Sequence, residues 1–129
     1  MSMIQEQVSK WVRTAFGERV ANDRKERGHR FLEEALELVQ AGEITREDAH
    51  ALVDYVYGRP VGELEQEVGG ASLTLLALCA AYGVDQEACA RTELARAWAN
   101  IEKIRAKQAA KPKVGPLAEA YDQKEIQVP

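Results

Sequence analysis

Apolar residues recur every three or four positions along most of the chain, the spacing that places them on one face of an α-helix. The pattern predicts five helices, over residues 3–16, 18–41, 45–57, 61–82 and 85–108. The sequence has no strand-like alternation of useful length, so we expect an all-α bundle of about five helices. It would form a single domain over residues 1–108, followed by an irregular tail over residues 109–129 that contains three prolines.

Residues with known capping preferences set the expected helix boundaries. Gly17, Gly42 and Gly83 are the expected ends of the first, second and fourth helices. Thr45 and Asp85 are N-cap candidates for the third and fifth helices.

The expected fourth helix differs from the others because nearly every residue from Val68 to Tyr82 is apolar or small. A helix that is apolar all round is normally buried on all sides. Gly69 and Gly70 lie inside it and are better explained by close approach of another backbone or a ligand than by helix propensity. A monomer of five helices offers little cover for such a segment, so we expect a homodimer or homotetramer.

The composition excludes several classes of protein. With 129 residues, 46% of them hydrophobic and 29% charged, the chain is expected to be globular rather than disordered. A net charge of −4 and an aromatic content of 6% argue against a nucleic-acid polymer as partner. The longest apolar run, residues 71–82, is too short for a membrane span, and two cysteines do not form a disulfide framework. The expected location is cytoplasmic, without a membrane partner.

Two groups of carboxylates are the first candidate for chemistry. Glu33, Glu34 and Glu37 share one side of the second helix, and Glu63 and Glu67 lie at the start of the fourth. If these two helices were antiparallel neighbours, the groups could face each other. That density of oxygen ligands suits Mg²⁺, with Mn²⁺ possible. The alternative is a solvated acidic face, which the helical period favours for the second helix because its carboxylates lie opposite the main apolar arc.

Basic residues near the end of the fifth helix are the second candidate. Lys103 and Arg105 could hold phosphate groups, and Asn100 could orient a base or a sugar. Arg30, beside the first carboxylate group, is a further candidate for binding phosphate. The alternative is a solvated last turn whose cations complement the helix dipole.

The order of these blocks resembles a known family. Glu33-Glu34-x-x-Glu37 is followed by Glu67-Val68-Gly69-Gly70 leading into an apolar helix, and then by a last helix with Asn100, Lys103 and Arg105. Over residues 20–108 this order resembles the MazG-like, all-α NTP pyrophosphohydrolases, and in particular their small phage and prophage members. The resemblance implies a Mg²⁺-dependent hydrolase that converts a nucleoside triphosphate, NTP or dNTP, and water to the monophosphate and pyrophosphate. It also implies a dimer or tetramer whose site lies in a shared helical bundle.

The same resemblance implies roles for individual residues. Glu34, Glu37 and Glu67 would bind metal, and Glu33 would act as a ligand or base. The second family motif is ExxD, in which Glu67 matches the Glu, whereas Gly70 stands at the position of the Asp. Either Glu63 or a side chain from another helix replaces that carboxylate, or the protein has lost turnover and acts as a nucleotide-binding or protein-interaction module.

Overall fold

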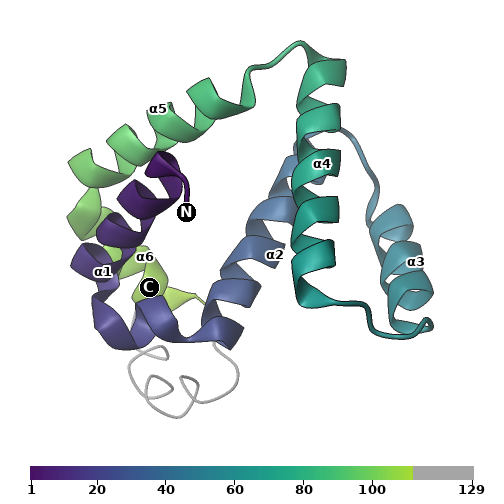
Figure 1. The fold of residues 1–129 in the computed structure, drawn as a ribbon, viewed down its shortest axis with the longest axis horizontal. Coiled ribbons are helices and arrows are strands. Elements are labelled where there is room, and N and C mark those ends of the chain that lie inside the picture. The colour runs from purple at the N-terminus through teal and green to yellow at the C-terminus, as the bar shows by residue number, and fades with distance from the viewer. Residues whose placement is uncertain (112–129) are drawn as a thin grey trace. The chain divides into compact units, whose positions relative to one another are not determined.

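The structure is a computed structural model that describes residues 1–111. Over this range it contains six α-helices and no strand, which confirms the predicted all-α class. The helices are α1 (Met3–Asn22), α2 (Arg24–Ala41), α3 (Arg46–Tyr57), α4 (Leu64–Tyr82), α5 (Gln86–Ala99) and α6 (Ile101–Ala110), shown in Figure 1. The expected irregular tail over residues 109–129 begins later than predicted, because Ala109 and Ala110 are helical, and its part from residue 112 lies outside the described residues.

The six helices agree with the predicted number of about five, but two of the expected boundaries differ: residues 18–22 belong to α1 rather than α2, and the last expected helix is divided into α5 and α6. The helix expected over residues 18–41 is interrupted at Asp23, whose backbone is extended and whose Oδ1 accepts a hydrogen bond from the Glu26 N–H at 2.9 Å. The helix expected over residues 85–108 is interrupted at Asn100, whose Nδ2 donates to the Arg96 carbonyl at 2.9 Å. In both places a short polar side chain bonds to nearby backbone and competes with continuation of the helix.

Other predicted boundaries are confirmed. Thr45 Oγ1 accepts from the Asp48 N–H at 3.1 Å, and Asp85 Oδ1 accepts from the Ala88 N–H at 2.7 Å. Gly83 ends α4 in the left-handed conformation, with a φ of 69°. Gly17 has a φ of 86° and breaks the helical path inside α1, at the residue where we expected the first helix to end.

The chain divides into two compact units. The terminal unit comprises Met1–Glu33 and Arg91–Pro129, and the central unit comprises Glu34–Ala90. By sequence, the terminal unit carries 15 basic and 10 acidic residues, a net charge of +5, whereas the central unit carries 2 basic and 11 acidic residues, a net charge of −9. The net charge of −4 is therefore the sum of a positively charged and a negatively charged unit.

In the terminal unit α1 and α6 pack side by side (Figure 1). Ala15, Val20 and Ala97 are buried there, together with one charged residue, Glu26. This unit therefore has a small core with a carboxylate inside it.

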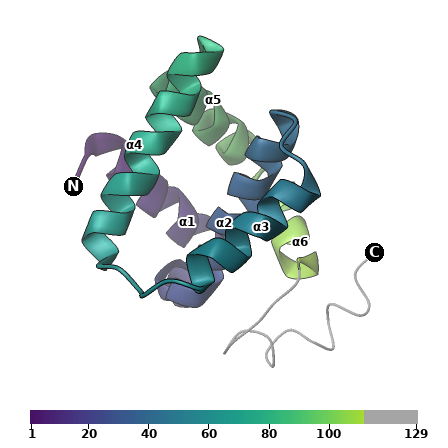
Figure 2. The same cartoon turned by 90° about the vertical axis from the view of Figure 1, so that its right-hand side faces the viewer.

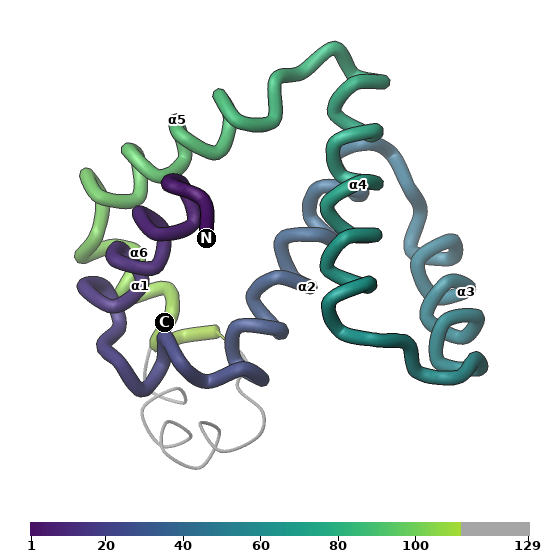
Figure 3. Tube along the Cα trace, in the orientation of Figure 1, coloured from purple at the N-terminus to yellow at the C-terminus, as the bar shows by residue number. Residues whose placement is uncertain are grey.

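In the central unit the second half of α2, α3 and α4 follow one another in alternating directions (Figures 2 and 3). None of its residues is buried. In α4 only Leu75, Leu78 and Cys79 are partly covered, so the burial on all sides that we expected is not reached within one copy of the chain.

No single helix among residues 1–111 is long and apolar enough to cross a membrane; only the bent pair formed by α4 and α5 reaches the required length and composition.

Candidate functional site

The first carboxylate group lies on α2 and contains two different environments. Glu33 Oε1 accepts hydrogen bonds from Arg30 Nη1 and from Lys111 Nζ, both at 3.0 Å. Glu34 and Glu37 are exposed and form no ion pair with any described residue. The charge of Glu33 is therefore already balanced, while Glu34 and Glu37 offer oxygens one turn apart that face water.

The second carboxylate group lies at the start of α4. Glu63 is the N-cap residue, and its backbone carbonyl accepts from the Glu67 N–H at 2.9 Å. The Glu67 side chain folds back over Gly62, and its carboxyl carbon lies 3.2 Å from where a Cβ would stand on that glycine. Gly62 therefore leaves the space that the Glu67 carboxylate occupies.

The position of the family Asp is open in this chain. A Cβ built on Gly70 meets no atom within 4 Å, apart from the backbone of its own helix turn. The first carbon of a side chain, such as the Cβ of the aspartate in the family motif, therefore meets no clash at residue 70.

The antiparallel arrangement that would bring the two groups face to face is not found. The Tyr82 hydroxyl occupies the place of the missing Cβ of Gly42, so the carboxyl ends of α2 and α4 meet. These helices run in the same general direction because α3 returns the chain between them (Figure 3). At 1.5 Å per residue, Glu37 lies about 7 Å and Glu67 about 22 Å from the joined ends. The two groups are therefore at different heights along their helices.

The described residues contain no group of three or more His, Cys, Asp or Glu side chains that could hold a metal ion. The candidate metal ligands that remain close together are Glu34 and Glu37. Glu63 and Glu67 lie apart from them at the start of α4. Mg²⁺ is commonly held by one or two carboxylates together with substrate phosphates and water. The donor chemistry of this pair therefore fits Mg²⁺ in the presence of a phosphate ligand, and the metal site stays a prediction.

The predicted phosphate-binding residues are largely engaged in structural contacts. Arg105 donates from Nε to the Ala15 carbonyl at 2.8 Å, from Nη2 to the Thr14 carbonyl at 2.9 Å, and from Nη1 to Glu102 at 2.7 Å. These two carbonyls precede the break at Gly17, where a helix loses its regular N–H donors. Arg105 therefore completes the hydrogen bonding of the broken helix and attaches α6 to α1.

The other three candidates differ among themselves. Asn100 forms the joint between α5 and α6, and Arg30 bridges Glu26 and Glu33 through its Nε and Nη1 atoms at 3.2 and 3.0 Å. Lys103 is exposed and makes no ion pair with a described residue. Of the four, Lys103 has the side chain best placed to meet a ligand from solution.

A buried carboxylate network was missed by the sequence reasoning. Glu26 is fully buried, and its Oε1 lies 2.6 Å from Gln108 Nε2 and 3.2 Å from Arg30 Nε. Arg27 is 3.9 Å away and stacks over the Phe16 ring. Burial lowers the pKa of Arg27 below its ordinary value, and the neighbouring Glu26 opposes that shift. Asp23-x-x-Glu26 has the spacing of a capping box, which is the sequence signal that could have marked this turn.

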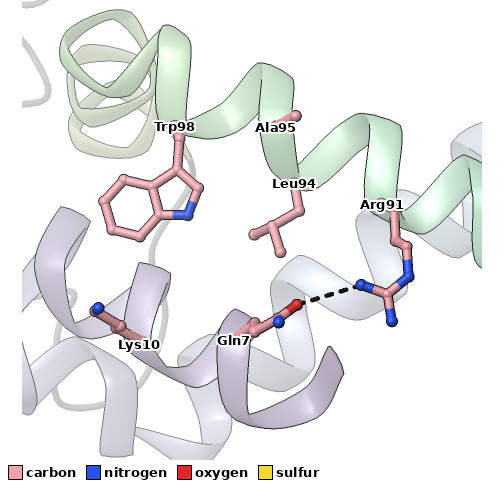
Figure 4. A pocket seen from close by; sticks show the side chains of 6 residues that line it. All are labelled: Gln7, Lys10, Arg91, Leu94, Ala95 and Trp98. Atoms are coloured by element: carbon pink, nitrogen blue, oxygen red, sulfur yellow. Dashed lines mark hydrogen bonds between the residues drawn. The ribbon is translucent and has the colours of Figure 1, made fainter. Parts of the chain in front are cut away.

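A shallow groove of about 400 Å³ lies between α1 and α5 in the terminal unit (Figure 4). Its apolar wall comes from α5, whereas α1 contributes polar side chains. It is lined by Gln7, Lys10, Arg91, Leu94, Ala95 and Trp98. Arg91 Nη1 donates to Gln7 Oε1 at 3.4 Å, and no acidic residue lines the groove. The groove therefore has the cationic side chains of Lys10 and Arg91 beside the indole ring of Trp98. Neither helical spacing nor motif order indicated this groove.

Comparison with known proteins finds no matching family model, no matching curated protein and no matching solved structure. The MazG-like interpretation therefore depends on the residues of this chain alone.

Proposed function

We propose that this protein is a Mg²⁺-dependent nucleoside triphosphate pyrophosphohydrolase, which converts an NTP or dNTP and water to the monophosphate and pyrophosphate. The proposal is supported by the motif order and by one observation about the carboxylates of α2. Glu34 and Glu37 are exposed and unpaired among the described residues, whereas their neighbour Glu33 is balanced by Arg30 and Lys111. Two adjacent uncompensated carboxylates repel each other, and a divalent cation relieves that repulsion.

In this proposal each residue of the site has a separate role in binding the metal, the water or the substrate. Glu34 and Glu37 hold the metal, which supplies polarisation of a phosphoryl oxygen and activation of a water molecule. Glu67, with Glu63 one turn earlier, lies at a different height along α4, so its predicted part as a ligand is not met beside this pair within one copy of the chain. Glu33, fixed by its two cations, orients the attacking water, and Lys103 binds a phosphate of the substrate.

The test is pyrophosphate release from the common NTPs and dNTPs in the presence of Mg²⁺ or Mn²⁺. We expect turnover that is lost in Glu37→Gln and retained in Glu47→Gln, which changes an exposed glutamate of α3 outside the cluster. Absence of pyrophosphate from every nucleotide, while an active enzyme of the same class releases it in parallel, would contradict the proposal.

A second candidate function is favoured by Gly70. The space beside this glycine is empty where the family motif carries a carboxylate, so the chain has the form of a degenerate family member. Such a protein would bind nucleotides or another protein without turnover.

Gly70→Asp separates the two functions, because a Cβ at residue 70 meets no atom within 4 Å and the change restores the carboxylate of the family motif. If the natural chain is inactive and Gly70→Asp gains metal-dependent turnover, the degenerate form is correct. If the natural chain is active and Gly70→Asp changes its rate by less than about tenfold, equivalent to 1.4 kcal/mol, the missing Asp is not required.

A further inference from the structure

The groove between α1 and α5 lies within the terminal unit and carries a cationic side chain at each end (Figure 4). Its wall on α5 runs from Arg91 to Trp98, which is two helical turns, or about 10 Å at 1.5 Å per residue. Lys10 of α1 lies at the Trp98 end, and Arg91 lies at the other end, as Figure 4 shows. A ligand that follows the groove therefore meets one positive charge near each end.

The polar side chains of the groove offer hydrogen-bond donors. The Lys10 ammonium, the Arg91 guanidinium and the Trp98 indole N–H can only donate. The acceptor atom of Gln7, its Oε1, already receives Arg91 Nη1 at 3.4 Å. The indole nitrogen is turned toward the middle of the groove in Figure 4 and has no hydrogen-bond partner among residues 1–111. A ligand that satisfies these donors must therefore carry acceptors, and negative charge on it is favoured.

The wall between the two cations is apolar. Leu94 is partly covered, Ala95 is exposed and Trp98 is 38% exposed. The Leu94 and Trp98 side chains both extend from α5 toward α1 (Figure 4). Tryptophan supplies a large contact area from a rigid ring, which is why it is enriched among the residues that dominate binding energy. The middle of the groove therefore suits an apolar side chain.

The shallow depth of the groove favours a peptide segment over a small molecule. Of its six lining residues only Leu94 is partly covered, and the other five are exposed. Small molecules are normally held in pockets that bury about 70–90% of their surface. A groove between two helices that is open to water instead suits a third, amphipathic helix, which places one face in the groove and leaves the other solvated.

We propose that this groove binds an acidic amphipathic helix of a partner protein. Acidic residues at positions i and i+7 of that helix are about 10 Å apart, one for each cation, and apolar residues at i+3 and i+4 pack on Leu94 and Trp98. The terminal unit has a net charge of +5 and no acidic residue lines the groove, so the charges of the two partners are complementary. The inference is independent of the proposed hydrolysis, because Glu34 and Glu37 belong to the central unit.

Binding is tested with the full chain and a labelled peptide of the stated pattern. The probe is an alanine-based helical peptide that contains Glu-x-x-Leu-Leu-x-x-Glu, and the matched control carries Gln in place of both Glu residues. Fluorescence anisotropy at low salt should give a Kd below about 1 mM for the acidic peptide and at least tenfold weaker binding, roughly, for the control. Added salt should weaken only the binding of the acidic peptide.

The position of the site is tested with substitutions in the protein. Lys10→Glu reverses a charge at an exposed residue and should weaken binding of the acidic peptide at least about tenfold. Lys25→Glu makes the same change at an exposed residue of the terminal unit outside the groove, and should alter the Kd less than about twofold. Trp98→Ala should weaken binding at least about tenfold, and circular dichroism verifies that each variant keeps its helices.

Several results would overturn the proposal. These are no binding of the acidic peptide at about 1 mM, equal affinity for the Gln peptide, and an unchanged Kd in Lys10→Glu. Equal or tighter binding of a linear aliphatic dicarboxylate of matching length would identify a small anion as the ligand. Displacement of the peptide by an oligothymidylate would identify a single-stranded nucleic acid, and either outcome would also contradict a helical protein partner.

Discussion

In the terminal unit α1, α2 and α6 are joined by the buried carboxylate of Glu26 and by the hydrogen bonds of Arg105, whereas in the central unit no residue is buried. Glu26 joins α2 to α6 through Gln108, and Arg105 joins α6 to the broken end of α1. The central unit has ordinary caps at Thr45 and Asp85, yet its apolar side chains remain open to water. Polar contacts of specific geometry hold the first unit together, whereas the second unit leaves most of its large apolar side chains exposed.

The largest effect is expected at Glu26. Glu26→Gln should lower the free energy of unfolding by about 3 kcal/mol, because it removes the buried carboxylate that Arg27 and Arg30 share and leaves Arg30 only its pair with Glu33. Urea denaturation at a fixed protein concentration measures the change.

The control for Glu26 is an exposed ion pair of the same unit. Glu93→Gln breaks the pair with Arg96, whose two side chains are more than half exposed, and should change the free energy of unfolding by less than about 1 kcal/mol. Equal effects of the two substitutions would show that the buried carboxylate of Glu26 contributes no more to the free energy of unfolding than the exposed carboxylate of Glu93.

Sequence reasoning reached the helical class and most boundaries because these depend on local information. Thr45, Gly83 and Asp85 act through contacts with residues three or four positions away. The partners of Glu26 and Arg105 lie 82 and 90 residues away in the sequence, and helical spacing carries no signal at that distance. The same reasoning left the direction of α2 relative to α4 open, because periodicity does not show which way α3 returns the chain.

The next effect concerns Arg105 and Lys103, which the sequence offered together as phosphate-binding residues. Arg105→Ala should destabilise the protein by about 2–3 kcal/mol, because it removes two charge-assisted hydrogen bonds to backbone carbonyls. Lys103→Ala should change stability by less than about 0.5 kcal/mol, as is usual for an exposed side chain without a described partner.

Enzyme kinetics distinguish a role in stability from a role in substrate binding for Arg105 and Lys103. If pyrophosphate release is observed, Lys103→Ala should raise KM while the thermal transition stays in place. A large loss of stability in Lys103→Ala, or none in Arg105→Ala, would reverse the roles that we assign to the two residues.

A smaller loss of stability is expected when a helix cap is removed, and one cap from each unit can be compared. Asp23→Ala should lower stability by about 1 kcal/mol, because Asp23 accepts from the partly buried Glu26 N–H. Asp85→Ala removes the same kind of bond at an exposed site, where water replaces it, and should cost nearer to about 0.5 kcal/mol. Thermal unfolding of the two variants under identical conditions provides the comparison, and a larger loss for Asp85→Ala would contradict the more tightly packed state of the terminal unit.

The smallest effect comes from two glycines inside helices. Gly28 in α2 and Gly69 in α4 both have room for a Cβ within one chain, so each change to alanine should stabilise its helix by about 0.5–1 kcal/mol. Gly28→Ala should do so at every protein concentration. Gly69→Ala should do so by a similar amount, because the described residues leave the same room at both glycines. Thermal unfolding over a series of protein concentrations measures both, and a loss of stability in either variant would show that another backbone approaches that glycine.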